Sequence, residues 1–140
     1  MSYDVIFARL ADGQSWEDFL AAEPADDDEA PLDPATWRQI VNRVREILPG
    51  ATESGDELLH EETAIQLYCQ ADAAQLHAQY WYTGEAARRV VSLLYRVAAV
   101  VAEETGLTAF DPQVEALVAD QRIDDAVAIF DSVAASFAHR

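Results

Sequence analysis

The sequence predicts an α+β fold with a ferredoxin-like βαββαβ core, in which helices cover one side of a four-stranded, mainly antiparallel sheet. Three observations lead to this prediction. Residues 83–113 read as a long amphipathic helix, a glycine stop at Gly106 and a short strand. Residues 64–70 and 75–82 alternate in polarity, as the strands of a half-buried hairpin do. Residues 3–10 are apolar on both sides of the alternation, which is typical of a central strand. A short N-terminal helix and a C-terminal helix are additions to this core.

The composition describes one acidic domain. The 140 residues suit a single domain, which buries roughly two-thirds of its unfolded surface at this size. The chain has 26 acidic residues against nine basic ones, all of them arginine, and a net charge of −17. Such a surface repels nucleic acid and anionic membranes and attracts a basic partner. The acidity serves either to attract that partner or only to keep the chain in solution.

Three features predict a soluble, cytoplasmic protein. The single cysteine, Cys69, excludes an internal disulfide and a cysteine-rich zinc site. The segment from Met1 to Val5 lacks the basic and apolar regions of a secretory signal. The longest unbroken apolar run, residues 97–102, is too short to span a bilayer.

A short helix and an acidic loop follow the first strand. Ser15 is typical of an N-cap because Asp18 follows three residues later, and the helix ends near Glu23. Residues 24–32 then read as an exposed loop within a single domain of residues 1–140, since closely spaced like charges resist compaction.

Four consecutive acids in this loop are candidate partner-binding residues. Eight acids and no base lie between Glu17 and Asp33. The segment is therefore either a solvated loop or a docking surface for a basic protein. A calcium site is a weaker alternative, because the alternating pattern of an EF-hand loop is absent. The four candidates are Asp26, Asp27, Asp28 and Glu29.

The next helix begins at Asp33-Pro34, where an N-cap precedes a proline suited to the first helical position. An apolar stripe runs along it, and Pro49-Gly50 ends it. Residues 51–62 read as an acidic linker. His60 in this linker has no second histidine at helical spacing, so we predict no metal site there. The stripe consists of Trp37, Ile40, Val41, Val44, Ile47 and Leu48.

The two strands of the predicted hairpin have different faces. A four-residue connection sets Tyr68 opposite His77. One face is apolar and includes Cys69, which reads as a small buried residue rather than a nucleophile. The other face is neutral, rich in amides and flanked by aromatic residues. It is either solvated sheet or a contact surface that a partner or a second copy of the chain covers. Its candidate partner-binding residues are Gln66, Tyr68, His77, Gln79 and Trp81.

The long helix and the final helix complete the predicted fold. Gly106 is able to adopt the left-handed conformation that closes the long helix, and strand 107–110 follows. Apolar residues spaced from Ile123 to Phe137 predict a final amphipathic helix. The stripe of the long helix consists of Val90, Val91, Leu94, Val97, Ala98 and Val101.

Two short motifs resemble a group of small, mostly uncharacterised bacterial proteins. Those proteins begin with a SYDL strand and close with a GL…YDPQ segment. The layout is similar over residues 2–113, whereas the acidic loop and the C-terminal helix lie outside the pattern. Some proteins of this type look like immunity proteins encoded beside toxins, so the resemblance implies a protein partner and no catalytic residues. The matching segments are Ser2-Tyr3-Asp4-Val5 and Gly106-Leu107-Thr108-Ala109-Phe110-Asp111-Pro112-Gln113.

Common catalytic and cofactor motifs are missing from the sequence. It contains no GxGxxG, P-loop, GxSxG or HExxH pattern and no lysine. The histidines, at positions 60, 77 and 139, are scattered. Asp111 precedes a proline, which is more typical of a turn than of a general base. We therefore predict that the protein is not an enzyme and that it uses no cofactor or metal.

These observations predict an acidic binding protein that neutralises a basic protein partner, for example a toxin, as an immunity protein or an antitoxin does. The first 62 residues hold 16 acids and four arginines, a net charge of −12, and the remaining 78 carry −5. That asymmetry favours fast, salt-sensitive association with a cationic protein. The alternative is a small-molecule-binding or catalytic ferredoxin-like homodimer with a pocket under the sheet.

Overall fold

The computed structural model describes residues 2–9, 15–21, 31–71 and 73–138. Within them the chain forms four α-helices, seven strands and one 3-10 turn. The elements are β1 (Ser2–Ala8), α1 (Trp16–Ala21), α2 (Pro34–Ile47), β2 (Thr52–Ser54), β3 (Glu57–His60), β4 (Ile65–Cys69), β5 (Ala73–Gln79), α3 (Gly84–Thr105), β6 (Thr108–Asp111), β7 (Ala116–Leu117), η1 (Val118–Asp120) and α4 (Ile123–Ala138).

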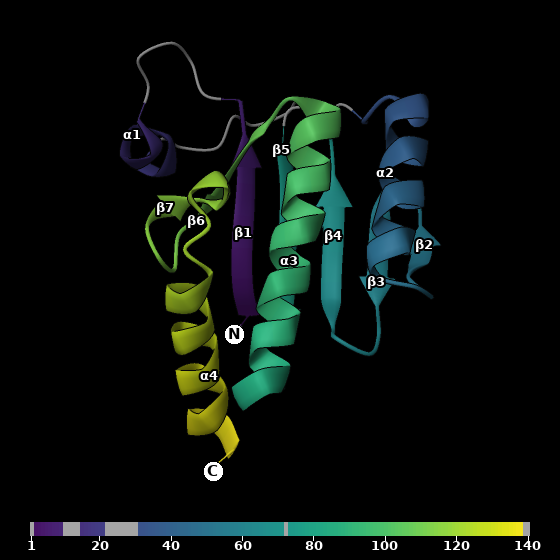
Figure 1. Ribbon diagram of the computed structural model, residues 1–140. Helices are drawn as coiled ribbons and strands as arrows, with labels where there is room; N and C mark the ends of the chain where they lie inside the picture. The colour runs from purple at the N-terminus through teal and green to yellow at the C-terminus, as the bar shows by residue number, and fades with distance from the viewer. Residues whose placement is uncertain (1, 10–14, 22–30, 72, 139–140) are drawn as a thin grey trace.

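All the strands belong to one open sheet with the order β2-β3-β4-β5-β1-β6-β7. Every neighbouring pair is antiparallel. The first strand of the chain lies between β5 and β6, where it is covered on both edges (Figure 1). The prediction of a central first strand is therefore confirmed, and so is the α+β class.

Two predictions about the sheet are wrong. It has seven strands where four were expected. Residues 51–62 are not a linker, because they form β2 and β3, a hairpin that pairs with β4. The physical reason is Leu58, which pairs with Leu67 on β4 and is 2 % exposed. Leu58 and His60 are the buried residues of β3, in alternate positions, and the acidic composition of the segment concealed this alternation.

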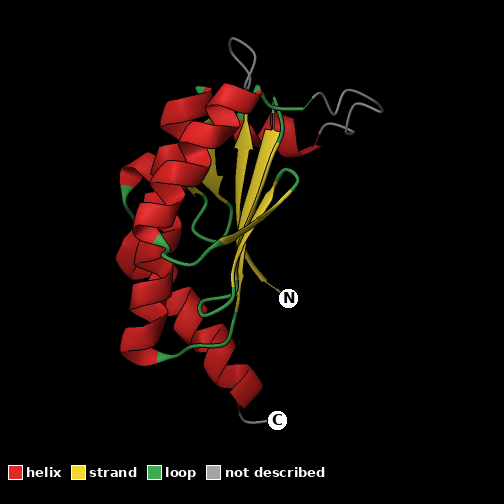
Figure 2. Cartoon of the chain, turned by 90° about the vertical axis from the view of Figure 1, so that its right-hand side faces the viewer, coloured by secondary structure: helices red, strands yellow, loops and turns green. Residues whose placement is uncertain are grey.

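Helices α2, α3 and α4 cover one face of the sheet, as Figure 2 shows with the helices in red beside the yellow strands. The predicted stripes of α2 and α3 point into this layer. Ile40, Val44, Val97 and Val101 are at most 1 % exposed. They pack against the inward side chains of β1, β4 and β5 in one continuous core.

The end of α3 follows its prediction. Gly106 has a φ of 75°, in the left-handed region, and its N–H donates to the carbonyl of Ala102 at 2.9 Å. Leu107 then packs into the core and is 3 % exposed. The chain thus reverses within two residues and enters β6 beside β1.

Helix α4 lies on the same side of the sheet as α3. Phe130 of α4 is fully buried, and its ring lies 6.0 Å from Tyr3 and 5.0 Å from Tyr80, centroid to centroid. The polar face of β4 and β5 is therefore not covered by the C-terminal helix.

Helix α1 contacts the opposite face of the sheet. Phe110 of β6 lies opposite Ile6 of β1 in the sheet. In each strand the adjacent residues face the helices, so the side chains of Phe110 and Ile6 point to the other side of the sheet. Trp16 stacks on Phe110 with centroids 4.6 Å apart. The predicted N-cap is present, because the hydroxyl oxygen of Ser15 accepts a hydrogen bond from the backbone N–H of Asp18 at 3.1 Å.

The register of the β4–β5 hairpin differs from the predicted one by two residues. Tyr68 lies opposite Gln75, and His77 lies opposite Gln66. The backbone N–H of Gln70 donates to the carbonyl of Ala73 at 2.8 Å, which closes a two-residue connection in place of the expected four. A shift of two keeps every side chain on its predicted face, because the side-chain period of a strand is two.

Candidate functional site

The candidate site is the open face of the sheet, on the side away from α2, α3 and α4. Gln66, Tyr68, His77 and Gln79 all lie on it and are half-buried by their neighbours. Trp81 follows the end of β5 and is 63 % exposed. The structure thus brings the five predicted hairpin residues to the same region, and it shows the aromatic side chains of two of them at the surface.

Hydrogen bonds at the end of β4 and between β4 and β5 hold the polar side chains of this face. Nε2 of His77 donates to Oε1 of Gln66 at 2.9 Å. The amide nitrogen of Gln70 donates to the hydroxyl oxygen of Tyr68 at 2.7 Å. On β1, opposite His77, lies Asp4. These bonds fix side chains in place before any partner arrives, which lowers the entropy that binding would cost.

The open face has carboxylates but no arginine on the strands that the structure describes. Asp4 and Glu57 are its charged residues on β1 and β3. Next to Glu57 in this hairpin, Leu59 also points to this side and is 38 % exposed. The open face therefore consists of apolar and amide side chains with the carboxylates of Asp4 and Glu57 beside them.

The four acidic-loop candidates, Asp26, Asp27, Asp28 and Glu29, lie outside the described residues. Their C-terminal flank is described. Pro31 forms an isolated bridge with Gln70 at the end of β4. Asp33 then caps α2 by accepting a hydrogen bond from the backbone N–H of Thr36 at 3.1 Å.

Arginines elsewhere are held by acids of the same chain. Arg43 joins α2 to α3 through Glu103 at 2.7 Å and Glu104 at 3.0 Å. Arg88 on α3 and Asp124 on α4 lie 2.9 Å apart. These exposed pairs add little stability. Their effect is to neutralise positive charge locally, so that the excess carboxylates set the sign of the surface.

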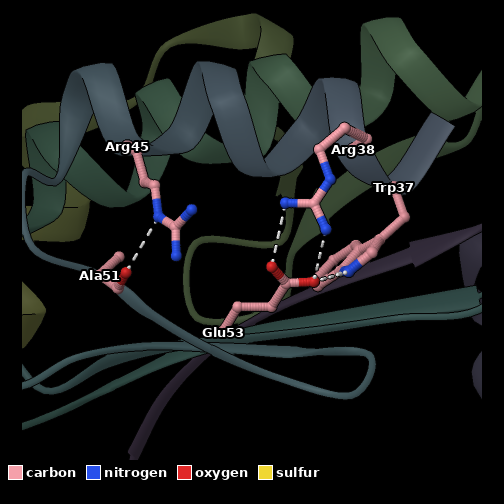
Figure 3. A network of polar contacts seen from close by, with 5 residues as sticks. All are labelled: Trp37, Arg38, Arg45, Ala51 and Glu53. Atoms are coloured by element: carbon pink, nitrogen blue, oxygen red, sulfur yellow. Dashed lines mark hydrogen bonds and ion pairs between the residues drawn. The ribbon is translucent and has the colours of Figure 1, made fainter. Parts of the chain in front are cut away.

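One such network attaches the β2–β3 hairpin to α2 (Figure 3). Nε1 of Trp37 donates to Glu53 Oε2 at 2.8 Å, and Arg38 binds both oxygens of Glu53 at 3.1 and 3.2 Å. Arg45 donates to the carbonyl of Ala51 at 3.2 Å. The hydrogen bond from Trp37, and then the one from Arg38, lower the pKa of Glu53.

A buried carboxylate joins the two sequence motifs, Ser2–Val5 and Gly106–Gln113. Asp111 is fully buried, and its Oδ2 accepts hydrogen bonds from the hydroxyls of Tyr3, at 2.5 Å, and Tyr95. Burial, followed by the hydrogen bond to Asp111, raises the pKa of each tyrosine.

Gln113 completes this cluster. Its backbone N–H donates to Oδ1 of Asp111 at 3.0 Å, which is the turn-capping role expected for an aspartate before proline. With its amide nitrogen turned toward β1, Gln113 also donates to Oδ1 of Asp111 at 2.9 Å and to the carbonyl of Asp4 at 2.7 Å. The residues of the two motifs therefore contact each other in the core. The sequence did not indicate that Tyr3 and Tyr95 bind Asp111.

The remaining reactive side chains have structural surroundings. His60 is buried, and its Nδ1 is hydrogen-bonded to Thr63 at 2.7 Å. Burial raises the pKa of the fully buried Cys69 thiol to about 12, so at neutral pH it is a thiol and not a thiolate nucleophile. Within the described ranges, no three histidine, cysteine, aspartate or glutamate side chains gather as metal ligands would.

In the part of the chain that the structure describes, every helix is too short or too polar to cross a bilayer. No protein-family model, curated protein or solved structure matches the chain.

Proposed function

We propose that the chain is an acidic binding protein that neutralises a basic protein partner, in the manner of an immunity protein or an antitoxin. The observation that carries this proposal is the open sheet face. It is one side of a seven-stranded sheet, several of its polar groups are hydrogen-bonded to one another, and exposed aromatic and aliphatic side chains lie on or beside it. Aromatic anchors within an uncharged polar surface are typical of protein interfaces.

The charge of the molecule selects the kind of partner. The net charge of −17 belongs to a surface whose described arginines are mostly paired with acids or backbone carbonyls. A cationic protein is drawn toward such a surface, whereas nucleic acid is repelled. The amide and aromatic side chains of β4 and β5 on the open face carry no formal charge apart from a titratable histidine, which favours close contact with a partner.

We also infer that the core is ferredoxin-like. The order β4-β5-β1-β6, with every pair antiparallel, supports this inference, because it is the order of the four strands in a split βαβ arrangement. Strands β2, β3 and β7 are then additions that widen the sheet at its two edges. The widening enlarges the open face beyond what four strands would offer.

Affinity capture from the native host tests the proposed function. We expect the immobilised chain to retain a basic protein at low salt and to lose much of it at high salt, since screening weakens charge attraction. The double variant Tyr68→Ala/Trp81→Ala should weaken that complex by at least about 2 kcal/mol if the two residues are anchors. Capture of no basic protein, or of one unaffected by this variant, would contradict the proposal.

The acidic-loop variant with Asn or Gln at positions 26–29 is the matched control for charge. We expect its free energy of unfolding to stay within about 1 kcal/mol of the wild-type value, as surface changes usually do. Its association with the captured partner should be slower, with little change in dissociation. Retention of a second copy of the chain alone would favour the homodimer over the neutralising role.

A further inference from the structure

A groove lies between α1 and the β6–β7 segment, on the same side of the sheet as the open face. Its volume is about 620 Å³. The apolar side chains that line it come from both α1 and β6–β7. They are Trp16, Phe110, Pro112 and Leu117. The pairing of Phe110 with Ile6 and with Leu117 makes the groove continuous with the sheet.

Two stacked aromatic side chains line part of the groove. Trp16 and Phe110 are nearly parallel, with an interplanar angle of 14° and centroids 4.6 Å apart. Phe110 is fixed in the sheet and is 8 % exposed, and Trp16 is half-buried against it. Aromatic rings attract planar and cationic groups.

Three carboxylates line the same groove. Glu17, Glu115 and Asp120 are exposed, and none of them pairs with an arginine among the described residues. This contrasts with the acids on α3 and α4 that hold Arg43 and Arg88. The groove therefore combines aromatic side chains with carboxylates that no arginine among the described residues pairs.

We propose that this groove receives an arginine side chain of the basic partner; the inference rests on the proposed function and names one contact within it. A guanidinium group is planar, stacks on aromatic rings and gives up its hydration more readily than an ammonium group does. It also forms paired hydrogen bonds with carboxylates. A neutral apolar ligand would leave the carboxylates desolvated without compensation, and an anion would be repelled.

Peptide titrations on the purified chain test the groove without the partner. The probes are acetyl-Gly-Arg-Gly-amide, its lysine analogue and its citrulline analogue, which has nearly the shape of arginine without the charge. The readout is the indole N–H signal of Trp16 in ¹⁵N spectra, with the buried Trp37 as the internal reference outside the groove. We expect a saturable shift of Trp16 with the arginine peptide, and affinities at least fivefold weaker for the lysine and citrulline peptides.

Matched variants separate groove binding from general acidity. Glu115 has a φ of 52°, a left-handed conformation that asparagine tolerates well, so Glu115→Asn removes the charge without added strain. We expect Glu115→Asn and Glu17→Gln each to weaken arginine-peptide binding at least threefold. Glu85→Gln, at an exposed carboxylate on the first turn of α3, should leave it unchanged.

Three results would overturn the inference. They are no saturable shift at Trp16, equal shifts with the citrulline peptide, and equal weakening by Glu85→Gln. A Trp16 shift that depends on protein concentration without peptide would place a second copy in the groove and would overturn it as well. Failure of the proposed function looks different, because it appears as the absence of a salt-sensitive basic partner in the capture experiment, whatever the peptides do.

Discussion

The hydroxyl group of Tyr3 donates a hydrogen bond of 2.5 Å to Oδ2 of Asp111, a residue 108 positions later in the chain. Tyr95 donates to the same oxygen from α3. A carboxylate at the centre of the core therefore joins the first strand, the long helix and β6. No described side chain in the core is left with an unsatisfied buried polar atom, so the cost of burying this group is met by its partners.

Replacing Tyr3 with Phe removes one hydrogen bond to Asp111 and keeps the ring. Because the lost bond joins a donor to a buried acceptor, we expect the free energy of unfolding to fall by about 1.5–3 kcal/mol. Tyr80→Phe is the matched control, since Tyr80 contacts the ring of Tyr3 but does not bond to Asp111. Urea unfolding of both variants measures the difference, and equal losses would show that the hydroxyl of Tyr3 is not special.

The same cluster predicts instability in alkaline solution. Burial and Asp111 raise the pKa of Tyr3 and Tyr95 in the folded chain. Their stabilising effect is complete below the unfolded pKa of about 10, and it is lost as the pH rises above that value toward the folded pKa. Each tyrosine should lower the free energy of unfolding by up to about 1.4 kcal/mol per pH unit there. Urea unfolding at pH 9, 10 and 11 gives the slope, and Tyr3→Phe should reduce it. An unchanged slope in the variant would refute this assignment.

Val97→Asp places a charge in the layer between α3 and the sheet. Val97 is fully buried, so the new carboxylate would lose its hydration inside an apolar core, and the domain should unfold. Ala99→Asp makes the same chemical change at an exposed position two residues later and should cost roughly 0.5 kcal/mol. Circular dichroism and thermal melts distinguish the two variants. A wild-type melting temperature for Val97→Asp would mean that α3 presents another side to the sheet.

Glu53→Gln tests how the added hairpin is attached. Trp37 and Arg38 lower the pKa of Glu53, so its contribution to stability is present above the unfolded pKa of about 4.3 and is lost as the pH falls below it. We expect wild-type protein to lose more stability than the variant between pH 6 and pH 3. Urea midpoints at the two pH values measure this, and parallel losses would indicate that Glu53 is bound no more tightly than other surface acids.

The elements with strong periodicity could be predicted from the sequence. The stripe of α3, its stop at Gly106 and the two faces of the β4–β5 hairpin all follow from spacings of 3.6 and 2 residues. The predicted faces of β4 and β5 are correct although the predicted register is wrong. A shift of two residues changes which residues lie opposite each other but leaves each side chain on the same face. The polar face of the candidate site was therefore predictable, although the pairing within it was not.

What could not be predicted depends on contacts between distant residues. Residues 51–62 have a linker-like composition, and the contacts that make strands of them are distant in sequence: Leu58 pairs with Leu67 on β4. The side chain of Glu53 is likewise held by Trp37 of α2. Likewise, no residue near Asp111 in the sequence indicates that Tyr3 donates a hydrogen bond to it. The aromatic groove escaped notice for the same reason, since Trp16 and Phe110 are 94 positions apart and meet only when α1 folds over β6.

The position of β1 in the sheet bears on the order in which the chain becomes able to fold during synthesis. This strand leaves the ribosome before the other described strands, yet its neighbours are β5, around residue 76, and β6, around residue 110. A strand with a fully apolar buried face must therefore wait unpaired while most of the chain is made, and long-range strand pairing is slow. We expect the sheet to close only after β6 has emerged, which leaves the nascent chain dependent on its acidity, or on a chaperone, to stay unaggregated until then.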